Sequence, residues 1–320
     1  MRLQLGGVIG RAFSLTWRHR WLWLLGLVGG GAGFSGNIGN TSNFGNRPGT
    51  ATGIDVVRSQ ARAFLEQDFW LVIAGVGLLV VVGVLVFLLY SVCVPASIWG
   101  TLSLDAGRPV RLGDAWRYGR SRFADFVRLG LLRFAIGLPG LVVLTVASIN
   151  LGHAFLYGTN DDLPSAFVLL GLSVIPVALV SLAAFVVLAW SERTMVILNL
   201  GALDGIRSGW WLLRHSLGDT LLFAVCMWAV LVGVSIVTTI GVVLLALPGG
   251  ILLAVGLLSH SAGVAVVGGA VLALLTIPAA LVAAGYGGSL VQAAYALAAR
   301  DLCISHRLEV VPGLLAPAPA

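Results

Sequence analysis

The sequence predicts an all-α integral membrane protein with six transmembrane helices arranged as three consecutive helical hairpins. Two observations lead to this fold class. The 320 residues are 58% hydrophobic and only 10% charged, whereas soluble domains carry about 25% charged residues. The apolar residues also gather in runs long enough to cross about 30 Å of hydrocarbon, which takes about 20 residues per helix.

The six predicted spans cover residues 21–36, 69–92, 133–151, 164–190, 220–247 and 263–299. The first is short, but the glycine-rich stretch after it is uncharged and lets it cross. Pro164 stands where the first residue of a helix favours proline. Residues 220–299 contain no Asp, Glu or Arg, so they make two crossings, with the break expected between Pro248 and Ala262. Residues 1–310 then form one membrane domain, and residues 311–320 form a disordered tail rich in proline.

The distribution of arginine sets the expected orientation. All 19 basic residues are arginine, and this model places sixteen of them on one side and only Arg47, Arg58 and Arg62 on the other. Basic residues near span ends gather on the cytoplasmic side. We therefore expect a multi-pass protein of the cell membrane with both termini in the cytoplasm. The net charge of +6 is explained by this orientation, and no nucleic-acid partner is predicted.

The cytoplasmic segments look like copies of one element. Residues 114–119 (DAWRYG) resemble residues 204–209 (DGIRSG), and residues 17–19 (WRH) align with 213–215 (LRH), which keeps Arg11 in register with Arg207. Helical spacing gives each copy an apolar stripe. The stripes are Leu203, Ile206, Trp210, Leu213 and Leu217 in one copy, and Leu112, Trp116, Gly119, Phe123 and Phe126 in another. Each hairpin is therefore expected to follow a short amphipathic helix lying in the membrane interface.

Residues 207–214 (RSGWWLLR), set between two long apolar spans, carry a family resemblance. They resemble the signature of a broad bacterial group that includes the membrane domain of some glycerophosphoryl diester phosphodiesterases and stand-alone relatives of unknown function. The family pattern places Trp directly after Ser, whereas Gly209 intervenes here. The resemblance implies a fold and a location in the bacterial inner membrane. It implies no activity, because the phosphodiesterase catalytic domain is missing.

The arginines of the short helices are the candidate functional residues. They could serve topology alone, or they could bind anionic lipid headgroups, since each arginine near such a surface contributes about 1 kcal/mol. The candidates for lipid contact are Arg11, Arg18, Arg117, Arg120, Arg207 and Arg214. Asp114 with Arg117, and Asp204 with Arg207, are expected to form weak pairs on the helix surface.

Other motifs favour structural interpretations. Residues 31–36 match G-x-G-x-x-G by chance, because a dinucleotide site needs a preceding strand. Ser289 lies far from the predicted depth of His153 and His260, and Ala280, Ala284 and Gly288 form a small-residue stripe for helix packing instead. Asn40 begins a formal glycosylation sequon in the outer loop, and Cys93, Cys226 and Cys303 are too far apart for a zinc site. No catalytic, cofactor-binding or metal-binding residue is predicted.

Few polar groups fall at mid-membrane depth: Glu192, Arg193 and Gln292 are placed at or near the inner ends of spans. Transporters usually keep such groups inside the bilayer. The leading prediction is therefore a non-enzymatic membrane protein with a structural, lipid-binding or partner-binding role. A small-solute or lipid-like transporter is the alternative, and an intramembrane enzyme comes third.

Overall fold

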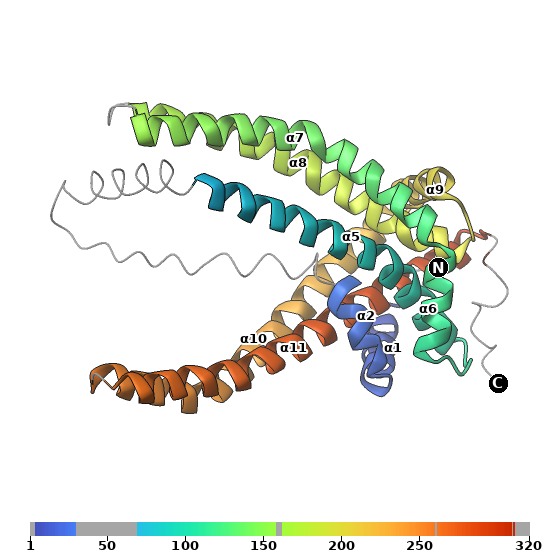
Figure 1. Ribbon diagram of the computed structural model, residues 1–320. Coiled ribbons are helices and arrows are strands. Elements are labelled where there is room, and N and C mark those ends of the chain that lie inside the picture. Colours follow the sequence, from blue (N-terminus) through green and yellow to red (C-terminus); the bar gives the residue numbers. More distant parts are fainter. Residues whose placement is uncertain (1–3, 30–68, 158–161, 260, 309, 311–320) are drawn as a thin grey trace.

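The computed structural model describes residues 4–29, 69–157, 162–259, 261–308 and 310, and every element in these ranges is a helix (Figure 1). Three short helices are α1 (Leu5–Arg18), α6 (Leu112–Ser121) and α9 (Ala202–His215), of which α6 and α9 each precede a long helix. The others are α2 (Trp21–Gly29), α5 (Phe69–Asp105), α7 (Phe123–Tyr157), α8 (Asp162–Ile197), α10 (Leu217–Leu258) and α11 (Ala262–Ser305).

Five of these helices, α5, α7, α8, α10 and α11, are long and apolar enough to cross a membrane. The break between α10 and α11 lies within the predicted interval. Only nine residues of α2 are described, and the rest of the predicted first span lies outside the described residues. The six-span count therefore stays a prediction, as do the outer loop and the tail of residues 311–320.

The long helices extend past the ends that hydropathy predicts. They have 35 to 44 residues, which corresponds to about 52–66 Å at 1.5 Å per residue. The α5 helix continues from the predicted end at residue 92 to Asp105, and α7 begins at Phe123 rather than at residue 133. Hydropathy marks only the turns that suit lipid, whereas packing between helices stabilises the more polar turns beyond them. Pro164 is the third residue of α8, not the first.

The helices pack tightly at one end of the bundle, which we call the packed end. Here α5, α8 and α11 finish, α7 and α10 begin, and the short helices lie across them (Figure 1). The core lies here and includes Ile98, Leu102, Trp190 and Leu297. Beyond it the α7–α8 and α10–α11 pairs diverge (Figure 1). Their outer halves expose large apolar side chains such as Leu172 and Leu244, as surfaces facing lipid do.

The two internal short helices α6 and α9 fold back onto the long helix that precedes each of them. Gly119 contacts the Val92 carbonyl of α5, and a methyl group at Gly209 would lie 2.5 Å from the hydroxyl oxygen of Ser191 in α8. The preceding positions in the repeat, Ala115 and Gly205, are also buried. Small residues let helices approach closely, so the buried face of the repeated element is a small-residue face.

This docking differs from the predicted apolar stripes. Gly119, Phe126 and Leu213 are buried, but Trp116, Leu203, Trp210 and Leu217 are 41%, 71%, 54% and 58% exposed. Large side chains would hold the helices apart, whereas the small residues of the repeat allow contact. These four large side chains consequently point away from the bundle.

Close packing of small residues also joins α2 to α11. A methyl group at Gly26 would lie 2.5 Å from the Gly285 carbonyl oxygen and 2.6 Å from the Ser289 Cβ. The predicted stripe of Ala280, Ala284 and Gly288 is displaced by one residue, because the face that contacts α2 is formed by Gly285 and Ser289 and Ala280 is exposed.

We predict that Gly26→Ala destabilises the protein by about 1–3 kcal/mol, because backbone atoms of α11 cannot yield to the added methyl group. The measurement is thermal unfolding in detergent. Gly10→Ala is the matched control, since its Cβ meets nothing within 4 Å and alanine stabilises an open helix position by up to about 1 kcal/mol. Equal stability of the two variants would contradict the packing.

Candidate functional site

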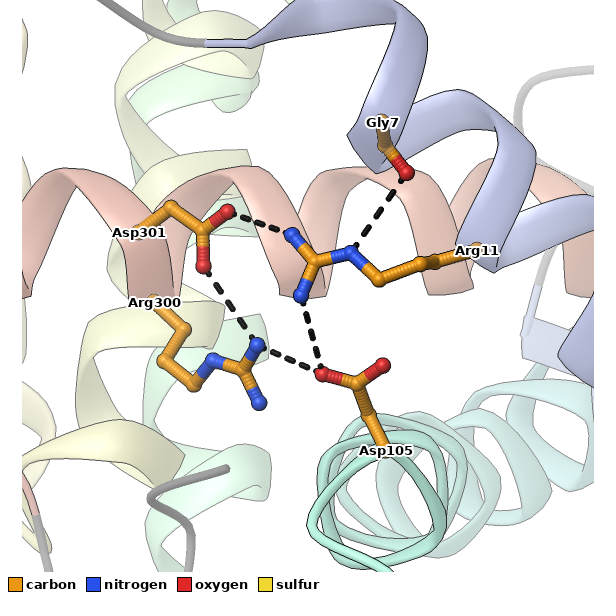
Figure 2. A network of polar contacts seen from close by, with 5 residues as sticks. All are labelled: Gly7, Arg11, Asp105, Arg300 and Asp301. Atoms are coloured by element: carbon orange, nitrogen blue, oxygen red, sulfur yellow. Dashed lines mark hydrogen bonds and ion pairs between the residues drawn. The ribbon is translucent and has the colours of Figure 1, made fainter. Parts of the chain in front are cut away.

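A network of four charged side chains joins three helices at the packed end (Figure 2). Arg11 of α1 donates to Asp105 of α5 over 3.2 Å and to Asp301 of α11 over 2.7 Å. Arg300 of α11 donates to the same Asp105 oxygen over 2.5 Å and lies 3.4 Å from Asp301. Arg11 also donates from Nε to the Gly7 carbonyl over 3.4 Å. Two guanidinium groups thus face two carboxylates.

The centre of this network is buried. The side chains of Arg300 and Asp105 are 2% and 8% exposed, whereas Arg11 is 39% exposed. Removing one partner of a buried ion pair leaves an uncompensated charge and costs about 3–5 kcal/mol. The pair therefore fixes how the ends of α5 and α11 meet, and Arg11 ties α1 to both.

A second polar cluster lies among α2, α5, α8 and α11. Tyr90 donates to Glu192 Oε1 over 3.0 Å, and Arg193 donates to Gln292 Oε1 over 3.0 Å. Gln292 in turn donates to the Gly29 carbonyl over 2.8 Å. Glu192, Arg193 and Gln292 are 5%, 4% and 5% exposed. The sequence placed these three residues at or near the inner ends of spans, but it did not predict that they are buried in one cluster.

The sequence hid this cluster for two reasons. The α8 helix continues beyond the predicted end at residue 190, so Glu192 and Arg193 lie within a packed helix rather than in a loop. Their partners are also distant in the chain: Tyr90 is 102 residues from Glu192, and Gln292 is 99 residues from Arg193. Placing each polar residue along its own span could not pair them.

The six predicted lipid-contact arginines separate into two groups. Arg11 has its guanidinium held by Asp105 and Asp301, because α1 packs across the ends of α5 and α11. The other five are exposed: Arg18, Arg117, Arg120, Arg207 and Arg214. Exposed aromatic rings accompany them on the same helices, at Trp17, Trp116 and Trp210.

The predicted helix-surface pairs are realised in one copy of the repeat. Arg207 lies 4.0 Å from Asp204, and both side chains are largely exposed. Asp114 accepts a hydrogen bond from the backbone N–H of Arg111 over 3.2 Å, at the start of α6. The carboxylate of Asp114 therefore caps its helix.

The remaining motifs have structural surroundings where they are described. The buried Ser289 hydroxyl donates to the Tyr286 carbonyl over 2.8 Å. Cys93 and Cys303 are buried free thiols and Cys226 is partly buried. Among the described residues no group of three or more His, Cys, Asp or Glu side chains could hold a metal ion. Residues 31–36, Asn40 and His260 lie outside the described residues.

The five long apolar helices and their exposed apolar surfaces define an all-α, multi-pass membrane protein. The chain belongs to a family of unknown function, DUF7544, which it matches over residues 13–300. Neither a curated protein nor a solved structure matches the chain. The family match does not connect the chain to the phosphodiesterase membrane domain, so that resemblance stays a prediction.

We predict that Asp105→Asn lowers the stability of the protein by about 3–5 kcal/mol, because the buried Arg300 then loses its closer carboxylate and keeps only Asp301 at 3.4 Å. Thermal unfolding in detergent measures the change. Asp204→Asn is the control, since an exposed ion pair contributes at most about 1 kcal/mol. If Asp105→Asn unfolds at the same temperature as Asp204→Asn, the network does not hold the packed end together.

Proposed function

We propose that the protein is a non-enzymatic component of the bacterial inner membrane that binds anionic lipid headgroups at the cytoplasmic leaflet. The docking of α6 and α9 carries this proposal. Both helices use their small-residue faces to contact the bundle, so their arginines and tryptophans are left on the outside. We call Arg18, Arg117, Arg120, Arg207 and Arg214 the arginine surface.

The residue types of this surface suit a membrane interface. Tryptophan favours the headgroup layer, because its ring is apolar and its N–H is polar. Trp116 is next to Arg117 in the chain, and Trp210 is one helical turn from Arg207 and Arg214, all of them exposed. An interfacial helix binds through buried apolar area together with attraction between its cations and anionic lipids. A short helix docked with this face outward meets both requirements.

A non-enzymatic role is supported by how the buried polar groups are used. Tyr90 donates to Glu192, and Arg193 and Gln292 bond each other. Arg300 and Asp105 are likewise paired. A catalytic acid or base must instead reach a proton of a bound substrate. These groups serve one another, which favours a structural role for both clusters.

Transport of a lipid-like molecule is the second candidate function. A cleft of about 1020 Å³ borders α5 and α7, and only Tyr90, Arg133 and Glu192 among its lining residues are polar. A small polar solute would find few hydrogen-bond partners along such walls, whereas an amphiphile would find suitable surroundings.

We predict that changing Arg117, Arg120, Arg207 and Arg214 together to Gln weakens retention of phosphatidylglycerol. Each lost charge should weaken binding about fivefold, corresponding to about 1 kcal/mol. Native mass spectrometry of the purified protein measures the number and persistence of bound lipids. The control changes the same four residues to Lys, which keeps the charge and should keep most of the lipid. Unchanged retention in the Gln variant would refute the proposal.

We predict that a cysteine at Gly113 is protected from a membrane-impermeant thiol reagent in intact cells, and that one at His153 reacts. Gly113 is exposed near the start of α6, and a Cβ added there would meet no atom within 4 Å. His153 is exposed near the far end of α7. The background variant replaces the three native cysteines with Ala. The native Cys303 cannot report orientation, because it is fully buried and should not react from either side. The opposite labelling pattern would reverse the orientation.

A further inference from the structure

The cleft between α5 and α7 has one polar end and two apolar walls. The polar end contains Tyr90 and Arg133. It is also bordered by two residues of α8, Leu188 and Glu192, and by two residues of α2, Leu27 and Val28. Further along, the walls are apolar. They include Val80 and Val84 of α5 and Leu138 and Leu141 of α7, all between 43% and 59% exposed.

At the polar end, the guanidinium group of Arg133 has N–H donors that do not bond to Glu192. Arg133 Nη1 lies 3.9 Å from Glu192 Oε1, which is beyond hydrogen-bond distance. Glu192 already accepts from Tyr90, and its second oxygen lies 3.7 Å from Arg193. Arg133 is 37% exposed, and its guanidinium carbon lies 5.2 Å from the centre of the Phe185 ring. Two guanidinium groups and one carboxylate leave a net positive charge beside the cleft.

The dimensions of the cleft suit a lipid chain. From Tyr90 to Val80 the α5 wall rises over ten residues, or about 15 Å, and from Arg133 to Leu141 the α7 wall rises about 12 Å. Both walls run from the polar end toward the outer halves of the helices. An amphiphile with its headgroup at Arg133 would therefore lay its chain along Val84 and Leu138.

The depth of Arg133 also suits a headgroup. From Arg133 to Tyr157, α7 rises about 36 Å, which is enough to cross the hydrocarbon layer of about 30 Å. If the outer half of α7 crosses the bilayer, Arg133 lies at the boundary between hydrocarbon and headgroups. A lipid of the same leaflet can then reach it without moving its phosphate into the hydrocarbon.

We infer that this cleft binds one membrane lipid with an anionic phosphate headgroup, with the phosphate at Arg133 and an acyl chain between α5 and α7. Arginine presents planar donors that match phosphate oxygens, and the surplus positive charge selects an anionic lipid over a zwitterionic one. The site shares no residue with the arginine surface. Either proposal can therefore fail while the other stands.

Two glycines provide a test that spares the packing of the bundle. Gly83 and Gly137 line the cleft, and a Cβ on either would meet nothing within 4 Å. Leucine at either position should fill the cleft without displacing neighbouring atoms. Gly75 and Gly171 are matched controls on α5 and α8, since their Cβ positions are equally open and they do not line the cleft.

The experiment delipidates the purified full chain and titrates it with phosphatidylglycerol, monitored by native mass spectrometry. We expect one tightly bound lipid that binds saturably. Its affinity should fall at least tenfold in Gly83→Leu and Gly137→Leu. Its affinity should stay unchanged in the controls Gly75→Leu and Gly171→Leu. Arg133→Gln should lower the affinity for phosphatidylglycerol by about tenfold or more. It should also remove the preference of the cleft for phosphatidylglycerol over phosphatidylcholine. Changing the arginine surface to Gln should leave this lipid in place.

Three results would overturn the inference. One is full lipid binding in both cleft-filling variants. Another is an unchanged preference for phosphatidylglycerol in Arg133→Gln. The third is displacement of the lipid by inorganic phosphate alone, which would mean that the walls contribute nothing. Having two cleft-filling variants keeps the test decisive if one of them fails to fold.

Discussion

The packed end depends on the ion pair between Arg300 and Asp105. These two residues are 195 positions apart in the chain, and their contact joins the ends of α11 and α5. Arg11 then adds α1 through Asp105 and Asp301. Apolar side chains such as Ile98 and Leu297 are buried at the same end. Buried charges tolerate few arrangements, since an unpaired one is costly. The pair thus specifies one way for α5 and α11 to meet.

A different constraint acts on the outer halves of the helices. Lipid chains are as apolar as leucine, so helices associate there mainly where small residues let them pack closely. The α10 and α11 helices stay together along their length because Gly249, Gly256 and Gly268 admit the backbone of the partner helix. The outer half of α5 has its own glycines, Gly75, Gly77 and Gly83, but a Cβ on any of them meets nothing. None of the described helices therefore packs closely against the small residues in that half of α5, and the space beside it forms the cleft.

Hydropathy predicted the all-helical class, the five long apolar helices and the break before α11, because these depend on properties read along the chain. It could not predict the packed end, which depends on partners distant in sequence. Arg11 looked like one arginine of a repeat, yet its partners lie 94 and 290 residues away. One signal was available: Ala115 with Gly119, and Gly205 with Gly209, are small residues four apart in both copies of the repeat. They predict a close-packed helix face, which shares only Gly119 with the predicted stripes.

Both proposed lipid sites lie near the boundary between the charged and the apolar parts of the helices. Along α7, exposed apolar side chains such as Phe134 and Leu141 follow Arg133, and the charged residues Asp125 and Arg128 precede it. A bilayer whose headgroup layer lies at Arg133 places the packed end, with its buried charges, on the water side of the hydrocarbon. The ion pairs then avoid the cost of ionised groups in lipid. The α6 and α9 helices lie at that same packed end, so under both proposals their exposed tryptophans and arginines would face the leaflet that supplies the cleft.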